Sequence, residues 1–418
     1  MTDIPGGVGT PPEPPAPVDP PAPVDLPVLA TVECPFCAVV VPDARFCGAC
    51  GAHLVHPGVR GSQRLHSYAA FPSEPVLRLS VVTSLFPHLS HRAKAPFRAG
   101  FSVFLALLLI FALIGASAPL IAVSALGVPL LFLLYIWEVD PYEGSFVEPT
   151  VVCLVVGVVL GAAWAIVGGS YVNKALLPSL GSRLTSGTAI VAAVVVPAIA
   201  QLLMCVPMVI VRARQRGPVE SLDGFVAGAT GALGFTLAAT IDLMKPWLSE
   251  GQLTHQGFVS NLTQVTLRGV TLPLISALAT GFIGTSFWAK TGSRATSARG
   301  AWLTSPAVAL LLAVLVQVGL GFTDIAGLSD ATLLVVHLGA FIVLALAMRV
   351  GLHHVLLHES VEVKVGPPQV CTHCYHLVPR MAFCPQCGVA DRATARRHRA
   401  APSESPDVGA SSMAGGPA

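Results

Sequence analysis

Two copies of one cysteine pattern lie near the two ends of this chain and constrain its fold more than any other feature. Both copies read C-x2-C-x9-C-x2-C, with the ligand candidates Cys34, Cys37, Cys47 and Cys50 in the first and Cys371, Cys374, Cys384 and Cys387 in the second. Each C-x2-C turn brings two sulfurs together, and two such turns joined by a short arm favour a tetrahedral four-sulfur site for zinc. We therefore expect two zinc ribbons, each holding one structural Zn²⁺ through all four cysteines.

The same spacing would also suit two disulfide-linked modules in an oxidising compartment. The stretch upstream of the first copy is rich in proline and does not resemble a signal peptide, which favours free thiolates in a reducing compartment. Both ends of the chain are therefore expected in the cytosol, with an even number of membrane crossings between them. Cys153 and Cys205 lie in apolar runs and are expected to be packing residues.

Between the two repeats the chain is too apolar for a soluble globular protein. Of its 418 residues, 53% are hydrophobic and only 11% are charged. A helix of about 20 apolar residues crosses a bilayer core of ~30 Å. Eight runs meet this requirement, at 99–117, 120–137, 150–169, 187–211, 224–243, 268–288, 305–322 and 331–349. The sequence thus predicts an all-α polytopic membrane bundle of eight transmembrane helices, flanked by two small zinc-ribbon modules.

Basic side chains next to the spans favour the same orientation. Three groups lie on the side assigned to the cytosol, namely Arg92, Lys94 and Arg98, then Arg212, Arg214 and Arg216, then Lys290, Arg294 and Arg299. The loops assigned to the other side contain few positive charges, as the positive-inside rule expects. The prediction is a multi-pass protein of the cell membrane with both termini cytosolic.

Composition divides the chain into seven segments. They are a disordered Pro-rich leader (1–30), a zinc ribbon (31–54), a connector and juxtamembrane segment (55–98), the membrane domain (99–349), a linker (350–368), a second zinc ribbon (369–390) and a disordered tail (391–418). Within the membrane domain, Gly157 and Gly161 are spaced as small-xxx-small, as are Gly224 and Gly228, which predicts close contacts between helices.

Several stretches of the membrane domain resemble the PrsW-type intramembrane protease family. The Pro-led helix Val194–Met204, the Asp-Gly entry into a Gly-rich helix over Ser221–Phe235, and the stretch Arg268–Leu278 are similar to its motifs. Ser84–Leu89 and Tyr135–Glu143 look like actinobacterial members, some of which carry ribbon modules. The resemblance covers about residues 80–360 and implies a helical protease scaffold.

The catalytic groups that the resemblance implies are substituted in this chain. Where the family has two glutamates, a lysine, a further glutamate and a histidine, this sequence has Ala200, Gln201, Met204, Ala239 and Ser276. His337 lies where a last histidine is expected, but its partner position is Phe341. Peptide hydrolysis needs a base to activate water and a group to stabilise the oxyanion. We therefore predict no catalytic residues in this chain.

Two other features have alternative interpretations. His354 and His358 share a helix face at the spacing of metal ligands, but no Glu directly follows the first His as in zincins, and protonatable side chains also suit a helix C-terminus. Arg392 to Arg399 is basic and could attract anionic lipid, although a solvated tail is the simpler interpretation.

These observations favour a catalytically inactive binding or regulatory protein. Its expected partners are the lipid bilayer and a protein, either a membrane helix or a cytosolic protein. Neither ribbon carries a dense basic and aromatic face, which disfavours nucleic acid. Two alternatives stay open: an active PrsW-family intramembrane metalloprotease that uses non-standard residues, and a small-solute transporter.

Overall fold

The structure is a computed structural model, and it describes most of the membrane domain and both cysteine repeats. The described residues are 30–35, 37–55, 86, 94–139, 147–176, 187, 190–215, 220–249, 258–289, 305–326, 328–359, 365–371 and 373–391. The predicted leader except its last residue, most of the predicted connector and the tail beyond Asp391 lie outside them.

Eight helical stretches in the described part of the chain are long and apolar enough to cross a membrane, as predicted. The first three are α3 (Lys94–Leu113), α4 (Ser117–Val139) and α5 (Val147–Leu176). The fourth joins η2 (Val191–Val195) to α7 (Val196–Arg214), and the fifth is α8 (Ser221–Ser249). The sixth joins α9 (Phe258–Thr266), η4 (Leu267–Thr271) and α10 (Leu272–Trp288), and the last two are α12 (Pro306–Ile325) and α13 (Asp330–Glu359).

Local backbone signals set where these helices end. Gly115 has a φ of +68°, and the Ala116 amide donates to the Phe111 carbonyl (3.0 Å), a pattern that terminates α3 before the 117 predicted from hydropathy. At the other extreme, α13 continues to Glu359, past the predicted span end at 349. Hydropathy locates the part of a helix that lies in lipid, whereas the helix itself propagates through polar residues beyond it.

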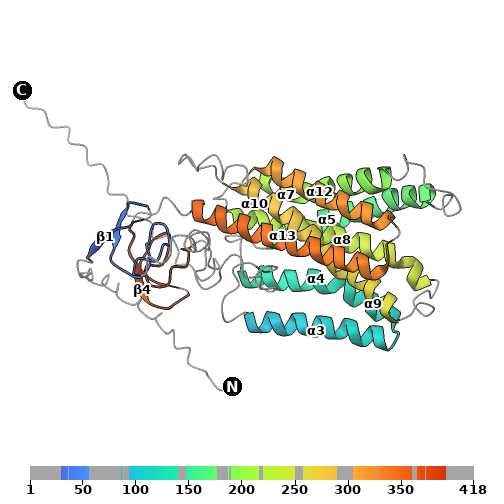
Figure 1. Cartoon of the computed structure of the whole chain (residues 1–418), viewed down its shortest axis with the longest axis horizontal. Coiled ribbons are helices and arrows are strands. Elements are labelled where there is room, and N and C mark those ends of the chain that lie inside the picture. Colours follow the sequence, from blue (N-terminus) through green and yellow to red (C-terminus); the bar gives the residue numbers. More distant parts are fainter. Residues whose placement is uncertain are drawn as a thin grey trace, which may run out of the picture.

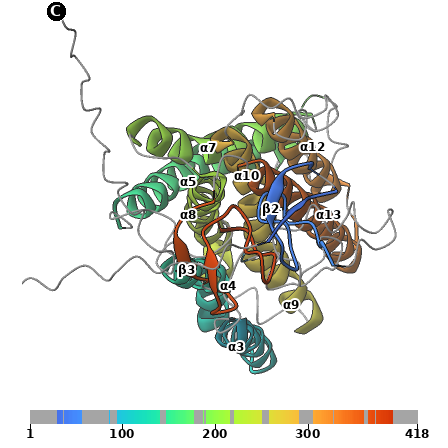
Figure 2. The same cartoon turned by 90° about the vertical axis from the view of Figure 1, so that its left-hand side faces the viewer.

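Helices α8 and α10 form the centre of the bundle. Both are mostly buried, whereas α3 lies at the periphery and contacts mainly α4 and α9 (Figure 1). Viewed along the helix axes, α8 and α10 are surrounded by α4, α5, α7, α12 and α13 (Figure 2). A single buried apolar cluster extends through this core and includes Phe132, Phe225, Ile275 and Phe282.

Glycines allow the central helices to approach one another closely, as the small-xxx-small spacing predicted. A Cβ at Gly224 would meet the carbonyl of Gly284, and one at Gly228 would meet that of Thr280, so α8 and α10 are in backbone contact. On the other face of α8, the Gly157 and Gly161 positions of α5 pack against its backbone in the same way. Because lipid provides no hydrophobic drive between helices, this packing is a main source of bundle stability.

Two spans widen into a π-helix directly before a proline. The amide of Val196 donates to the Val191 carbonyl at the end of η2, and Pro197 follows. In the same way the amide of Leu272 donates to the Leu267 carbonyl at the end of η4, and Pro273 follows. Proline has no N–H and its ring crowds the preceding turn, so the local i→i−5 pairing absorbs the disruption.

The two cysteine repeats fold into small β-hairpin modules. In the first, β1 (Thr31–Glu33) pairs antiparallel with β2 (Val40–Pro42), and in the second β3 (Pro368–Val370) pairs antiparallel with β4 (Leu377–Pro379). The registers are equivalent, with Val32 opposite Val41 and Gln369 opposite Val378. Both modules lie beyond the same end of the helical bundle (Figure 1). We call them ribbon 1 (30–55) and ribbon 2 (365–391).

Candidate metal centres and the polar cluster inside the bundle

The four cysteines of each ribbon converge on one point. In ribbon 1 the Sγ atoms of Cys34 and Cys50 lie 3.7 Å apart and those of Cys37 and Cys47 lie 3.8 Å apart. In ribbon 2 the corresponding pairs, Cys371 with Cys387 and Cys374 with Cys384, are both separated by 3.8 Å. Four sulfurs about 2.3 Å from a tetrahedral metal would be about 3.8 Å apart. Each group can therefore hold one metal ion.

The backbone positions these sulfurs by two tight turns in each ribbon. After the first C-x2-C turn, Ala38 and Tyr375 adopt a positive φ, and their amides donate back to the carbonyls of Cys34 and Cys371 (2.9 and 2.8 Å). After the second turn, Gly51 and Gly388 both have a φ of +73°. The left-handed backbone at that position favours the Gly that directly follows the last Cys.

Hydrogen bonding among the thiols makes one sulfur in each ribbon ionise most readily. The Cys50 thiol donates to Cys47 and lowers the pKa of Cys47 to about 5. In ribbon 2 the Cys384 thiol donates to Cys371 and lowers the pKa of that thiol well below its usual range. The same hydrogen bonds raise the pKa of the donors, Cys50 strongly and Cys384 to about 11. A bound cation would replace these protons, because thiolate is the form that coordinates a metal.

A second candidate site lies inside the bundle, where polar side chains from three helices meet. Gln201 on α7 donates from Nε2 to the hydroxyl of Thr280 on α10 (3.1 Å). Gln317 on α12 donates from Nε2 to Oε1 of Gln201 (3.4 Å) and to the hydroxyl of Ser276 on α10 (3.3 Å). All four side chains are buried. This polar cluster lies near the middle of its spans and consists of amides and hydroxyls.

Two positions that the resemblance singled out, Gln201 and Ser276, thus belong to one cluster. Gln317 links them, and the sequence marked it only as a polar residue at depth. The other singled-out positions lie elsewhere: Ala200 and Met204 pack with Phe235 in a small apolar cluster. Ala239 on α8 is half-buried.

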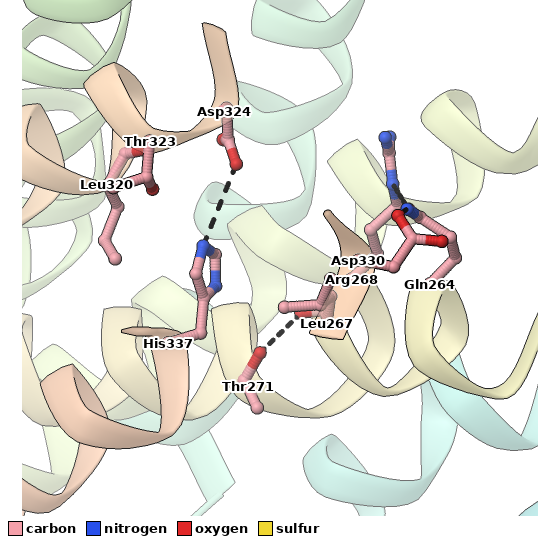
Figure 3. A network of polar contacts seen from close by, with 9 residues as sticks. All are labelled: Gln264, Leu267, Arg268, Thr271, Leu320, Thr323, Asp324, Asp330 and His337. Atoms are coloured by element: carbon pink, nitrogen blue, oxygen red, sulfur yellow. Dashed lines mark hydrogen bonds and ion pairs between the residues drawn. The ribbon is translucent and has the colours of Figure 1, made fainter. Parts of the chain in front are cut away.

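His337 lies apart from the polar cluster, on α13. Its side chain is 2% exposed, and neither ring nitrogen has a hydrogen-bond partner among the described residues. Its Nε2 atom is 3.8 Å from a carboxylate oxygen of Asp324 at the end of α12, and Figure 3 shows the imidazole directed toward that carboxylate. Asp324 is 56% exposed. The pair lies between the end of α12 and the first turns of α13, and α13 runs from there toward the ribbons, so the pair is at the opposite end of the bundle (Figure 1).

A polar network surrounds the π-helix η4 at that same end (Figure 3). Arg268 donates from Nε to Gln264 (3.3 Å), and Gln264 donates from Nε2 to Asp330 at the start of α13 (2.8 Å). In a π-helix the Arg268 carbonyl would accept a hydrogen bond from the amide of residue 273. That residue is Pro273, which has no N–H. The Thr240 hydroxyl of α8 donates to this carbonyl instead (3.3 Å). This network therefore ties η4 to α8 and α13.

The remaining candidates are only partly described. His354 and His358 lie on α13, but their side chains are outside the described part of the structure, as is the basic stretch from Arg392 to Arg399. Cys153 is buried, and the Cys205 thiol donates to the Gln201 carbonyl (3.3 Å).

Comparisons with protein-family models, with curated proteins and with solved structures find no match to this chain. The description of this chain as a multi-pass membrane protein with two four-cysteine centres therefore rests on its own sequence and geometry.

Proposed function

We propose that each ribbon holds one structural Zn²⁺. The support is the donor set of four sulfurs with pairwise separations of 3.7 to 3.8 Å, which suits tetrahedral coordination by thiolates. All four positions of the tetrahedron are filled by protein, which is typical of structural zinc and leaves no position for a substrate or a water.

We further propose that the chain is a binding protein on a PrsW-like scaffold and does not hydrolyse peptide bonds. The observation that carries this proposal is the polar cluster of Gln201, Ser276, Thr280 and Gln317. An amide cannot take a proton from water as a general base, and an aliphatic hydroxyl needs a neighbouring base before it can attack a carbonyl. The cluster contains neither a general base that could activate water nor a base that could activate its hydroxyls.

The hydrogen bonds within the cluster also argue for a structural role. The side-chain nitrogens of Gln201 and Gln317 are both used in contacts between helices, and the Oε1 atom of Gln201 accepts one of those contacts. A network whose members satisfy one another stabilises one arrangement of α7, α10 and α12. Gln201 and Ser276 stand where the resembled family has catalytic residues, and their meeting in one cluster supports the proposed scaffold. Their amide and hydroxyl groups support the proposed lack of peptide hydrolysis.

The proposed binding partner is a transmembrane helix. Most glycines of the described spans are covered by a neighbouring helix, but a Cβ added at Gly319 on α12 or at Gly339 on α13 would have nothing within 4 Å, and both lie on the outer surface. Leu312, Leu315 and Phe322 on α12 are exposed at the helical spacing around Gly319. Small residues flanked by apolar ones allow a second helix to approach closely in lipid.

The decisive experiment follows membrane proteins for cleavage in three cell lines. One lacks the protein, one carries the wild type, and one carries Gln201→Leu with Ser276→Ala. The proposal expects the same set of fragments in all three. It is wrong if a membrane protein is cut only in wild-type cells and the purified wild-type chain reproduces that cut.

Binding is tested separately with a photo-crosslinking side chain at Leu315. We expect it to trap a membrane protein, and Gly319→Leu to abolish the trapping because the partner helix can no longer approach. The matched control is the same group at Val159 on α5, which is 60% exposed but lies between Gly157 and Gly161, whose faces are already filled. Equal trapping at both positions, or trapping unaffected by Gly319→Leu, would remove the evidence for a specific partner.

A further inference from the structure

The two ribbons are equivalent residue by residue, at one constant offset. The strand pairs match, the isolated bridge of Phe46 with His53 matches that of Phe383 with Ala390, and the positive-φ residues fall at the same places. Gly48 in ribbon 1 therefore corresponds to Pro385 in ribbon 2. Each of these residues directly follows a ligand cysteine, Cys47 or Cys384.

The ribbons contact each other through these equivalent positions. The amide of Phe46 donates to the carbonyl of Pro385 (2.9 Å), and the amide of Phe383 donates to the carbonyl of Gly48 (2.9 Å). The contact thus uses the same surface of both modules, related by an approximate two-fold axis, as in an isologous dimer interface. In each ribbon the donor directly precedes a ligand cysteine and the acceptor directly follows it. The interface therefore fixes the backbone of one metal-binding turn against the other.

Side-chain packing across this interface is not symmetric. Met381 of ribbon 2 is buried in the small core of ribbon 1, together with Cys34, Val41 and Cys47. Gly48 makes the room, since a Cβ there would collide with the Met381 thioether. The residue of ribbon 1 equivalent to Met381 is Ala44, which is too short to fill ribbon 2 in return. Ribbon 1 thus has a core that is complete only when ribbon 2 is folded beside it.

Ribbon 2 has an additional anchor. Its buried residues Phe383, Val389 and Ala390 belong to the same apolar cluster as the core of the helical bundle. Phe383 also lies against Gly51 of ribbon 1. Ribbon 2 therefore contacts both the bundle and ribbon 1, and it connects the first metal centre to the membrane domain.

We propose that the two ribbons form one metal-binding module, in which metal at one site increases the affinity of the other. This rests on the proposed metal sites. Metal binding folds a ribbon of this size, so the free energy of binding at one site includes the free energy of forming the shared interface. Because linkage is reciprocal, emptying either site weakens the other by the same factor. Couplings of this kind are typically about 5- to 150-fold. The module joins two distant parts of the chain at one end of the bundle.

The test uses the purified full-length protein in detergent, loaded with Zn²⁺ and titrated with a chelator while released metal is measured. The wild type is expected to lose both metals in one steep transition. In Cys384→Ser, which empties ribbon 2, the metal held by ribbon 1 should leave at a chelator concentration lower by about 5-fold or more. The same shift is expected for ribbon 2 in Cys47→Ser.

Met381→Ala tests the interface while all eight ligand cysteines stay in place. Because the interface contributes to binding at both sites, Met381→Ala should lower the chelator concentration at which both metals leave, whereas Met381→Leu, of similar volume, should retain the wild-type transition. Leu377→Ala is the matched control, because Leu377 is a ribbon 2 residue that is 67% exposed. If Cys384→Ser and Met381→Ala both leave ribbon 1 with its wild-type affinity, the sites are independent and the proposal is wrong. This outcome would leave the two metal sites and the proposed absence of peptide hydrolysis untouched.

Discussion

The Nε2 atom of Gln317 on α12 lies 3.4 Å from the Oε1 atom of Gln201 on α7, and this contact joins residues 116 positions apart in the chain. Both amides are buried among apolar helices. In a bilayer no water is available to replace a lost partner, so each amide depends on the hydrogen bonds that it makes to the other amide and to the hydroxyls of α10. The pair, with Ser276 and Thr280, therefore holds three spans together at mid-depth.

Replacing Gln201 by Leu should destabilise the bundle by about 1–2 kcal/mol, the cost of losing hydrogen bonds between helices in a membrane. Gln201→Glu should cost more, because it would place an ionisable group in an apolar interior. The measurement is unfolding in mixed detergent, followed by helical signal. Leu202→Ala is the control, since that side chain is 50% exposed on the same helix. Wild-type stability in Gln201→Leu would show that the cluster contributes nothing.

Gly284→Ala should destabilise the protein by about 1–3 kcal/mol, as overpacking does. The added methyl would meet the carbonyl of Gly224, and a backbone atom of a facing helix cannot rotate away. Gly319→Ala makes the same chemical change where nothing lies within 4 Å, and it should be neutral or stabilising by about 0.5–1 kcal/mol, because Ala is the better helix former. Equal effects of the two substitutions on the unfolding transition would contradict the close contact of α8 with α10.

Much of this architecture could be predicted from the sequence because its signals are local. Long apolar runs locate the spans, and cysteine spacing identifies both four-sulfur groups. The spacing of Gly157 with Gly161 also predicted close packing, but it could not say against which helix. The structure shows that both glycines, which lie on α5, pack against the backbone of α8.

Relationships between distant residues could not be predicted in this way. Nothing near Met381 indicates that its side chain completes the core of ribbon 1, because that depends on how two modules at opposite ends of the chain dock. Likewise, Gln317 is one polar residue in an apolar run until α12 is placed beside α7 and α10. The π-helices also went unpredicted, although Pro197 and Pro273 were the local signal that could have indicated them.

Elemental analysis of the purified protein should give about two equivalents of zinc per chain, one for each four-sulfur group. Cys34→Ser and Cys371→Ser each remove one of four ligands, so each should lower the content to at most one equivalent, and the double variant should bind none. Cys153→Ser is the control, because that thiol is buried in the bundle and outside both four-sulfur groups. Recovery of the eight ribbon cysteines as disulfides would contradict the assignment.

The two ribbons should face the cytosol. They contact each other directly, so they lie on one side of the membrane, and eight spans separate them in the described part of the chain. Arg212 and Arg214 end α7 at the same end of the bundle, which the positive-inside rule assigns to the cytosol. Reporter fusions at residues 30 and 400 should therefore both give cytosolic signals, while a reporter inserted after Ala326, between α12 and α13, should give the opposite signal.

Opposite signals at 30 and 400 would mean an odd number of crossings, which is incompatible with the hydrogen bonds of Phe46 to Pro385 and Phe383 to Gly48. Agreement of those two fusions with each other but on the outer side would keep the ribbon pairing and reverse the orientation, and with it the reducing environment that the thiolates require.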